Sequence, residues 1–130
     1  GFGTLGYALP AAIGRALADP SRPVVALAGD GGFQFTLPEL GTAAEEGARV
    51  IVVVWNNRGY REIETAMREA GAEPVGVTPR PPDLVQLARA YGIPAERVGA
   101  LEALPGLLRE AAGRRGPTLI DLPAELVHGG

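Results

Sequence analysis

The sequence predicts an α/β fold, a three-layer sandwich in which a mostly parallel sheet is flanked by helices. Two apolar runs, Val24–Ala28 and Val50–Trp55, have the length of buried strands. The second run is almost continuously β-branched and does not alternate with polar residues, which is typical of a strand covered on both faces in a parallel sheet. Strand-like and helix-like segments alternate along the chain, as they do in βαβ units.

Before the first strand, the chain is expected to form one helix. Residues 7–17 are mostly small or apolar and suit a closely packed helix, in which Pro10 is tolerated because it lies near the first turn. The sequence Asp-Pro-Ser-Arg-Pro at 19–23 breaks that helix and leads into the first strand.

Between the two strands, the sequence predicts a second helix. Thr36 and Glu39 have the spacing of a capping box, in which the threonine accepts from free amides of the first turn and the glutamate reaches back to the cap. The helix is expected to run to about Glu46, with Gly47 as its stop. The second strand then covers Arg49–Trp55.

The second half of the chain continues the alternation. A third helix is expected over 58–70, closed by Gly71, and the proline-rich segment 73–82 is expected to be a surface loop. Asp83 then caps a further helix. The buried stripe of that helix has the spacing i, i+3, i+4, i+7 and consists of Leu84, Leu87, Ala88 and Tyr91.

A short strand over 96–100, a helix and a last strand over 118–122 complete the predicted elements. The apolar stripe of this last helix consists of Leu104, Leu107, Leu108 and Ala111, and Gly113 ends it. We therefore expect residues 1–123 to form one domain and residues 124–130 to be a frayed tail.

The composition argues against several classes of protein. The 130 residues suffice for one domain with a sizeable core. The net charge of −3, without a basic run, gives no footprint for nucleic acid, and no apolar stretch approaches the ~20 residues that cross a bilayer. The lack of cysteine excludes disulfides and thiolate metal sites and fits a cytoplasmic protein. Since the sequence has no initiator Met and opens in a glycine-rich segment, we expect a fragment of a longer chain.

Small polar residues follow both apolar runs, at the point where each predicted strand ends. Asp30 follows the first run and Asn57 the second. Because the carboxyl ends of neighbouring parallel strands meet at one edge of a sheet, we expect these side chains to lie close together. A carboxylate, an amide oxygen and the backbone carbonyl of Gly59 are ligands that suit Mg²⁺, and the bare amides of Gly31 and Gly32 suit a phosphate. The sequence therefore predicts a site for magnesium and a diphosphate.

Other interpretations of the glycine motifs stay open. Asp-Gly after a strand is also a tight-turn signal, and Asn-Asn-Arg-Gly is also a loop signal. Residues 1–6 formally match Gly-x-Gly-x-x-Gly, but the strand that precedes a dinucleotide-binding loop is not in this sequence, so we interpret them as a loop that permits close backbone approach. The single histidine, His128, lies in the expected tail and is assigned no catalytic role.

Three motifs, in this order along the chain, resemble one family. Gly29-Asp30-Gly31 and Asn56-Asn57 resemble the thiamine diphosphate signature at its usual spacing. The upstream segment 3–14, Gly-Thr-Leu-Gly-Tyr-Ala-Leu-Pro-Ala-Ala-Ile-Gly, looks like the one that precedes this signature in acetolactate synthase-like enzymes and 2-oxo acid decarboxylases. The resemblance covers nearly the whole chain. It implies the diphosphate-binding domain of a thiamine diphosphate-dependent enzyme, usually the C-terminal one of three domains.

The resemblance implies roles for individual residues at the edge of the sheet. Asp30, Asn57 and the Gly59 carbonyl would hold Mg²⁺, while Gly31 and Gly32 would contact the diphosphate.

Two residues of the upstream segment also match the family. Leu5 matches the apolar residue that props the cofactor, thiamine diphosphate, into its bent V shape, and the Gly3 carbonyl would accept from the 4′-amino group of the pyrimidine. Leucine departs from the methionine common in acetolactate synthases, but an apolar wedge is all that the bending requires. Core packing is the alternative for Leu5.

The same resemblance implies a lyase or transferase, which decarboxylates a 2-oxo acid or condenses the resulting enamine with a second carbonyl through the carbanion chemistry of the cofactor. In the family, the activating glutamate comes from a different domain of a neighbouring subunit, so the full-length enzyme is expected to be a homodimer or homotetramer. No residue of this chain matches that glutamate, and we expect the isolated fragment to be inactive. The alternative function is a non-catalytic Mg-nucleotide or cofactor-binding α/β module.

The residues after the two asparagines bear on the substrate. The motif Gly59-Tyr60-x-Glu62-Ile63 and the later Pro-x-Gly-Val at 74–77 look more like the guanidino-oxopentanoate decarboxylase branch than like biosynthetic acetolactate synthase. A glutamate near the pocket would then suit a cationic substrate tail. The alternative for Glu62 and Glu64 is a solvated helix face that pairs with neighbouring arginines.

Overall fold

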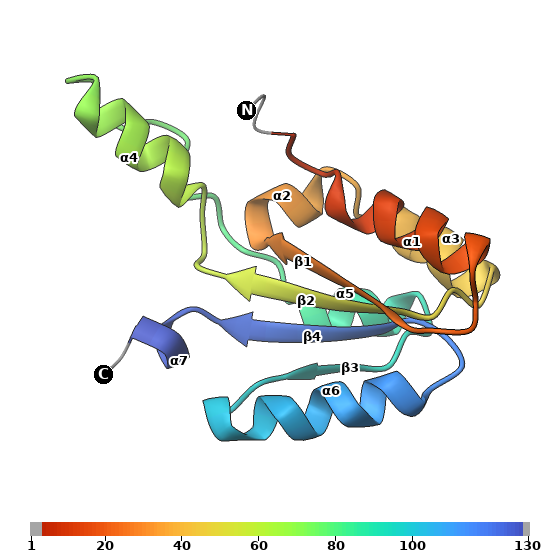
Figure 1. Ribbon diagram of the computed structural model, residues 1–130. Coiled ribbons are helices and arrows are strands. Elements are labelled where there is room, and N and C mark those ends of the chain that lie inside the picture. The colour runs from red at the N-terminus through yellow and green to blue at the C-terminus, as the bar shows by residue number, and fades with distance from the viewer. Residues whose placement is uncertain (1–3, 129–130) are drawn as a thin grey trace.

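The computed structural model describes residues 4–128, within which four parallel strands form one sheet in the order β1-β2-β4-β3 (Figure 1). This confirms the predicted α/β class and the parallel sheet. The strands are β1 (Val24–Gly29), β2 (Val50–Asn56), β3 (Ala95–Arg97) and β4 (Thr118–Pro123). The helices are α1 (Ala8–Ala18), α2 (Asp30–Gln34), α3 (Glu39–Glu45), α4 (Arg61–Glu69), α5 (Leu84–Ala90), α6 (Leu104–Gly113) and α7 (Glu125–His128), and a 3₁₀ turn (Leu101–Ala103) precedes α6.

The central strand β2 carries the core. Residues 50–54 are all buried, and their side chains alternate between two apolar clusters. Val50, Val52 and Val54 face a cluster that includes residues of α1, α2, α3 and α5, whereas Ile51 and Val53 face a cluster built mainly with α6. The sheet therefore lies between two helix layers. Burial on both faces explains why the sequence of β2 is apolar without alternation.

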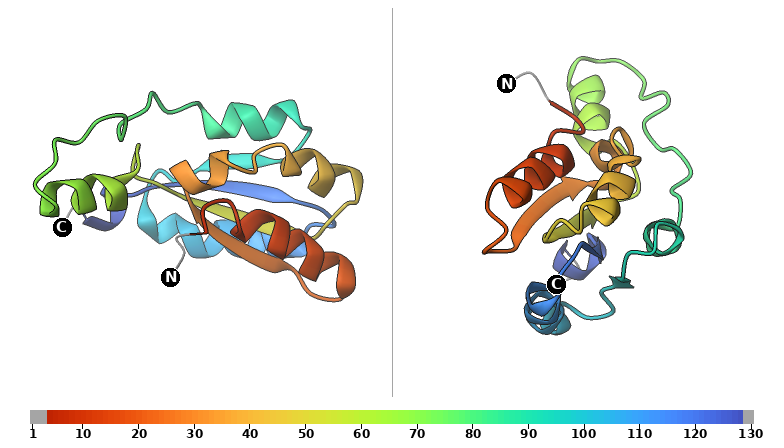
Figure 2. Two further views of the ribbon diagram at one scale, coloured as in Figure 1. Left: turned by 90° about the horizontal axis from the view of Figure 1, so that it is seen from above. Right: turned by 90° about the vertical axis from the view of Figure 1, so that its right-hand side faces the viewer.

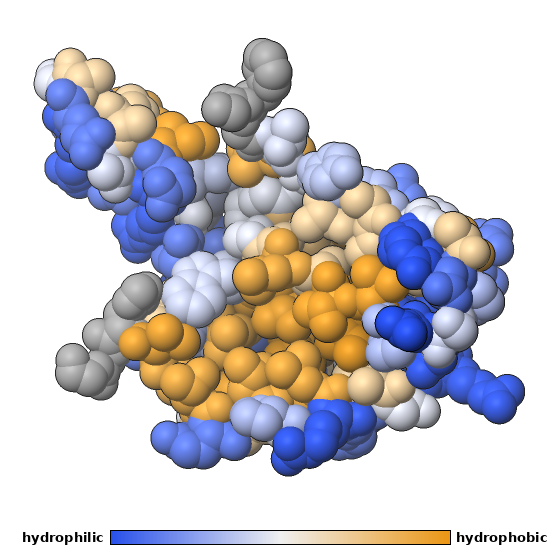
Figure 3. Space-filling model, in the orientation of Figure 1, coloured by the Kyte–Doolittle hydropathy of each residue, from blue (hydrophilic) through white to orange (hydrophobic). Residues whose placement is uncertain are grey.

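The edge strand β1 differs from the fully buried strand that its apolar run predicted. Ala26 is buried in the first cluster, but Val25 is 57% exposed and Leu27 is 65% exposed. Among the described residues, β1 pairs only with β2. Figure 3 shows apolar side chains gathered over the sheet between α1 and α6 on this side of the molecule. The run is apolar on both faces, yet only one of them is covered here.

The segment after β1 forms a helix and not the tight turn that Asp-Gly also signals. Asp30 is the first residue of the short helix α2, and Gly31 and Gly32 lie in its first turn. The prediction of a capping box at Thr36 is wrong. The Thr36 hydroxyl donates to the Gly6 carbonyl (2.9 Å), and α3 begins without a side-chain cap. The predicted stop is confirmed, since Gly47 has φ +59.

Helix α4 begins at Arg61, later than the predicted start at Arg58. Arg58 itself has φ +58 and is not helical. None of the described residues of α4 is buried, and Figure 1 shows the helix standing away from the sheet. The segment that follows it is a loop, as predicted, and Figure 2 shows it running along the outside of the molecule to α5.

The last third of the chain follows the prediction closely, except at its end. The Asp83 carboxylate accepts from the Gln86 amide (3.1 Å) and so caps α5. The strand β3 is short and begins at Ala95. Instead of fraying after Pro123, the chain forms α7, from which Leu126 packs against the second cluster. None of the described helices is long and apolar enough to span a membrane.

Candidate functional site

The carboxyl ends of β1 and β2 bring Asp30 and Asn57 together, as the sequence predicted. The two strands pair in register, with Gly29 opposite Trp55, so the residues that follow them lie at one edge of the sheet. Asp30 is buried, with 3% of the residue exposed. Its Oδ1 accepts from the Asn57 amide (3.3 Å) and its Oδ2 from the Gly59 amide (3.1 Å). The backbone of the loop after β2 thus fixes the position of the carboxylate.

The side-chain amide of Asn57 lies between two oxygen atoms. One of the two terminal positions of the amide is 3.0 Å from Asp30 Oδ1 and 2.8 Å from the Gly59 carbonyl oxygen. When the amide nitrogen takes this place it donates to both oxygens; when the amide turns over, the Asn57 oxygen takes the place instead. Three oxygens then converge from a carboxylate, an amide and a backbone carbonyl. In this second orientation, the three oxygens could share a cation; in the first, the hydrogen bonds of the Asn57 amide hold them together.

The spacing of these atoms fits magnesium. Oxygens that coordinate Mg²⁺ lie 2.0–2.1 Å from the ion, so neighbouring corners of its octahedron are about 2.9 Å apart. The separations of 3.0 and 2.8 Å match that spacing. Among the described residues there is no cluster of three His, Cys, Asp or Glu side chains. A set with a single carboxylate is nonetheless ordinary for Mg²⁺, which keeps several waters and binds substrate phosphates.

A pocket of about 450 Å³ opens beside these oxygens. It is lined by Leu5, the first turn of α2 (29–32), the loop residues Asn57 and Gly59, and the start of α4 (60–63). The first amides of a helix have no carbonyl partner within that helix, so the Gly31 and Gly32 amides are free of helical bonds. The pocket therefore joins a set of oxygens to a set of backbone N–H groups, which are the partners that a metal-bound diphosphate needs.

The two glycines of α2 allow bulky side chains to approach the pocket. A Cβ on Gly31 would lie 2.5 Å from the Tyr60 ring, and a Cβ on Gly32 would lie 3.3 Å from Leu5 Cδ2. Tyr60 in turn makes an edge-to-face contact with Phe35, with ring centroids 6.5 Å apart. Gly31 and Gly32 thus serve the packing of the pocket walls as well as its amides.

Leu5 borders the pocket and does not belong to the core. Its side chain is 49% exposed, which rules out the core alternative. The turn that carries it is held by the bond from Thr36 to the Gly6 carbonyl, and Gly6 has φ +87, a conformation that favours glycine. Gly3, the other residue predicted from this segment, lies outside the described residues.

The proline-rich loop contacts the loop after β2 (residues 57–60), and the sequence did not predict this contact. The Val77 carbonyl accepts from the Tyr60 amide (2.9 Å), and a Cβ on Gly59 would lie 2.7 Å from the same oxygen. Val77 is 5% exposed. A valine within a proline-rich segment was the only sequence signal for this contact.

The two glutamates at the start of α4 have different surroundings. Glu64 accepts from Arg68 (2.9 Å) and Arg61 (2.7 Å), and these bonds lower its pKa below the ordinary value. Glu62 lines the pocket and has no hydrogen bond or ion pair with another described residue. The interpretation as a paired, solvated helix face therefore holds for Glu64 and not for Glu62.

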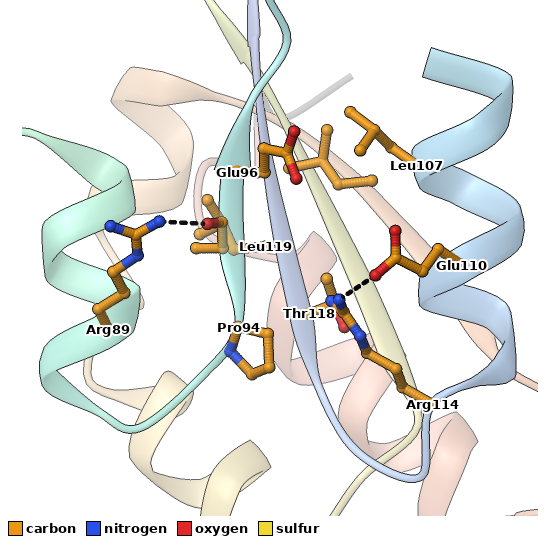
Figure 4. Close-up of a pocket in the computed structure, with 10 residues that line it drawn as sticks. Arg89, Pro94, Glu96, Leu107, Glu110, Arg114, Thr118 and Leu119 are labelled. Atoms are coloured by element: carbon orange, nitrogen blue, oxygen red, sulfur yellow. Dashed lines mark hydrogen bonds and ion pairs between the residues drawn. The ribbon is translucent and has the colours of Figure 1, made fainter. Parts of the chain in front are cut away.

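A second hollow, of about 220 Å³, lies between α5, β3, β4 and α6 (Figure 4). Both of its arginines are engaged within the domain, since Arg89 donates to the Ala95 carbonyl (3.2 Å) and Arg114 pairs with Glu110. None of the predicted site residues lies in it. The pocket beside Asp30 is therefore the candidate site.

Comparison with known proteins agrees with this geometry. Residues 1–122 match the family model described as "Thiamine pyrophosphate enzyme, C-terminal TPP binding domain". The chain is 47% identical over 123 residues to the "Probable 2-ketoarginine decarboxylase AruI" of Pseudomonas aeruginosa, covering 94% of this chain and 22% of that protein. It is 35% identical over 125 residues to the "Acetolactate synthase" of Bacillus subtilis, covering 96% of this chain and 22% of that protein.

Solved structures show the same fold. A thiamine diphosphate-dependent 4-hydroxybenzoylformate decarboxylase of Rhodococcus jostii RHA1 superposes with a TM-score of 0.86 at 32% identity, over 92% of this chain and 23% of that one. A benzoylformate decarboxylase from Polynucleobacter necessarius gives a TM-score of 0.87 at 33% identity, over 94% of this chain and 24% of that one. The chain thus spans less than a quarter of the length of these relatives.

Proposed function

Because the chain belongs to the thiamine pyrophosphate enzymes, as their C-terminal TPP-binding domain, we propose that it holds thiamine diphosphate through Mg²⁺ within a longer 2-oxo acid decarboxylase. One observation carries the proposal. The Asn57 side chain lies 3.0 Å from Asp30 Oδ1 and 2.8 Å from the Gly59 carbonyl, with the spacing of neighbouring ligands in a magnesium octahedron.

The residues around the pocket divide the binding between them. Asp30, Asn57 and the Gly59 carbonyl would hold Mg²⁺, and the ion would bind the diphosphate of the cofactor. Gly31 and Gly32 offer their amides to the same anion from the first turn of α2. Leu5, on the pocket wall, would supply the apolar side for the cofactor, and the Gly3 carbonyl, which lies outside the described residues, would accept from its pyrimidine amino group.

Bound thiamine diphosphate supplies an electron sink for the carbanion left when carbon dioxide departs from a 2-oxo acid. The net reaction converts R–CO–COO⁻ and a proton into the aldehyde R–CHO and carbon dioxide. This chain supplies the binding and orientation, and apolar pocket walls that limit water near the reacting carbon. Condensation with a second carbonyl, as in acetolactate synthases, is the alternative outcome, and the higher identity to the decarboxylase favours simple decarboxylation.

For the substrate, we propose a 2-oxo acid with a guanidinium tail. The similarity to a protein named as a 2-ketoarginine decarboxylase supports this class. So does Glu62, whose carboxylate lines the pocket without a partner among the described residues. A carboxylate and a guanidinium form the strongest of the common side-chain ion pairs, because the two planar groups can bond in parallel.

The remaining parts of the enzyme are proposed to lie outside this chain. The glutamate that activates the cofactor would come from another domain of a neighbouring subunit, so the whole protein would act as a homodimer or homotetramer. Residues 1–123 would then be one of three domains, and this chain by itself would be inactive. A non-catalytic Mg-nucleotide module is not favoured, since the family match specifies a thiamine pyrophosphate domain.

Calorimetric titration of the full-length protein tests the proposed function. We expect thiamine diphosphate to bind only when Mg²⁺ is present and the Asp30→Ala variant to lose this binding. The wild-type protein should also release carbon dioxide from 2-oxo-5-guanidinopentanoate. Preference for ATP or NAD over thiamine diphosphate, or metal-independent binding of the cofactor, would contradict the proposal.

A further inference from the structure

A fully buried carboxylate lies one strand away from the proposed metal site. Asp121, on β4, is 0% exposed and sits opposite Val54 of β2. Its Oδ1 accepts from Asn56 Nδ2 (3.0 Å) and its Oδ2 from Arg97 Nε (2.7 Å). Burying a carboxylate costs free energy unless it is paired and hydrogen-bonded, so these partners explain how β4 tolerates an acid among apolar neighbours.

The other polar atom of the Asn56 side chain, Oδ1, contacts the loop after β2. This atom accepts from the backbone amide of Arg58 (3.3 Å). Arg58 has φ +58 and is the only non-glycine with a positive φ among the residues that the structure describes. Residues other than glycine rarely adopt this backbone conformation, so surrounding contacts must hold it. The bond from the Arg58 amide to Asn56 is such a contact.

The conformation of Arg58 decides where the neighbouring ligands point. Arg58 lies between Asn57 and Gly59, which supply two of the three converging oxygens. The left-handed turn at Arg58 lets the Gly59 amide reach Asp30 Oδ2 (3.1 Å) while the Gly59 carbonyl faces the Asn57 side chain (2.8 Å). A relaxed, right-handed Arg58 would turn the Gly59 peptide away from both.

Asp121 also sets the direction of the Asn56 amide. A carboxylate only accepts hydrogen bonds, so it selects the Nδ2 end of Asn56 and leaves Oδ1 to face the Arg58 amide. If the amide turned over, two donors would meet at Arg58 and two acceptors at Asp121. The orientation of the Asn56 amide at the loop therefore depends on the Asp121 carboxylate, which does not itself contact the loop.

We propose that Asp121 and Asn56 are positioning residues for the metal site, with Asp121 orienting Asn56 and Asn56 holding Arg58 in the conformation that aligns Asn57 and Gly59. This inference rests on the proposed function, because the metal site is part of it. Neither residue is one of the proposed metal ligands. Residues that orient metal ligands typically change the metal affinity by about 10- to 100-fold when they are altered.

An exchange of the two side chains between their positions tests the proposal. In Asp121→Asn, the new amide presents its N–H₂ group to Asn56, so Asn56 turns over and loses the Arg58 amide. In Asn56→Asp, two carboxylates face each other. In the double variant Asn56→Asp with Asp121→Asn, the carboxylate at position 56 accepts from the Arg58 amide and from the new amide at position 121. The oxygen of that new amide still accepts from Arg97. The side chains at both positions keep their size and shape.

The readout is the affinity for Mn²⁺ as a paramagnetic substitute for Mg²⁺, measured by electron paramagnetic resonance on the full-length protein with thiamine diphosphate present. We expect each single variant to bind Mn²⁺ about 10- to 100-fold more weakly and the double variant to recover the wild-type affinity. Such a reversal in a double-mutant cycle reports coupling between the two positions.

The control is Ile120→Ala, which disturbs the second apolar cluster from the residue next to Asp121. It should lower the Tm and leave the Mn²⁺ affinity unchanged. The proposal is overturned if Asp121→Asn behaves like this control, or if the double variant folds and recovers its Tm without recovering its Mn²⁺ affinity. A wild-type protein in which Mn²⁺ binding needs neither thiamine diphosphate nor Asp30 contradicts the proposed function instead.

Discussion

The ring of Tyr60 lies directly on the backbone of Gly31, so closely that a Cβ on Gly31 would be 2.5 Å from a ring carbon. The contact joins the first turn of α2 to the residue that precedes α4. It therefore ties the amides proposed for the diphosphate to the wall of the pocket proposed for the substrate.

Replacing Gly31 by alanine should displace the Tyr60 ring and weaken cofactor binding. The added methyl group meets a side chain that can rotate, so we expect a stability loss of about 1 kcal/mol or less but a clear loss of thiamine diphosphate affinity. Calorimetry on the full-length protein measures the affinity. Gly14→Ala is the matched control, because nothing lies within 4 Å of a Cβ there and helix α1 should gain about 0.5–1 kcal/mol. An unchanged cofactor affinity in Gly31→Ala would show that the contact does not matter for binding.

Replacing Gly59 by alanine should be more damaging than the same change at Gly31. The Cβ would lie 2.7 Å from the Val77 carbonyl oxygen, which is backbone and cannot rotate away. We expect about 1–3 kcal/mol of lost stability, together with loss of Mg²⁺-dependent binding, because the Gly59 peptide must move. Urea denaturation and metal titration check the two effects. A Gly59→Ala protein of wild-type stability would contradict the packing described here.

Glu62 and Glu64 should respond differently to the same substitution. Glu62→Gln removes the free carboxylate of the pocket, and we expect kcat/KM for a guanidino 2-oxo acid to fall about 10-fold or more while a neutral 2-oxo acid is unaffected. Glu64→Gln breaks two ion pairs on the surface of α4, so it should lower the Tm only slightly, without changing substrate preference. Equal effects of Glu62→Gln on both substrates would contradict a role for Glu62 in selecting charge.

The turn between α1 and β1 should show an unusually acidic carboxyl group. Hydrogen bonds from the Ser21 hydroxyl, with help from Arg15 and the Ser21 amide, lower the pKa of Asp19 from 3.8 to about 2. Because the pKa is lower in the folded state, the stabilisation is present above pH 3.8 and is lost as the pH falls through about 2. Carbon-detected NMR titration measures the midpoint directly. Ser21→Ala should raise the pKa towards its ordinary value, and an unshifted midpoint in the wild type would refute the assignment.

Local sequence signals predicted the parts of the site that depend on neighbouring residues in the chain. The unbroken apolar run of β2 marked a central strand, and the polar residues directly after β1 and β2 identified Asp30 and Asn57. Because β1 and β2 pair in parallel, their carboxyl ends lie at the same edge of the sheet, which brings Asp30 and Asn57 together.

The features that sequence reasoning missed depend on contacts distant in the chain. Val25 and Leu27 are apolar, and nothing in the run itself shows which face of β1 is covered. The fold of Asp30-Gly-Gly into the first turn of α2 was hidden because glycine has a low helix propensity. Asp121 was visible as a lone acid in an apolar strand, but its partner Asn56 lies on another strand and was grouped with Asn57 by sequence alone.

The exposure of α4 has a consequence for how this pocket can change. At one end of the pocket, Asp30 is buried and hydrogen-bonded by the loop after β2, whereas α4, at the other end, projects outward with no buried residue among those described. Hydrogen exchange should accordingly be fast along α4 and slow along β2. The Asp30 end of the pocket is thereby fixed, and the α4 end is free to vary. Substitutions on α4 can therefore alter which acid is accepted without disturbing the Asp30 end.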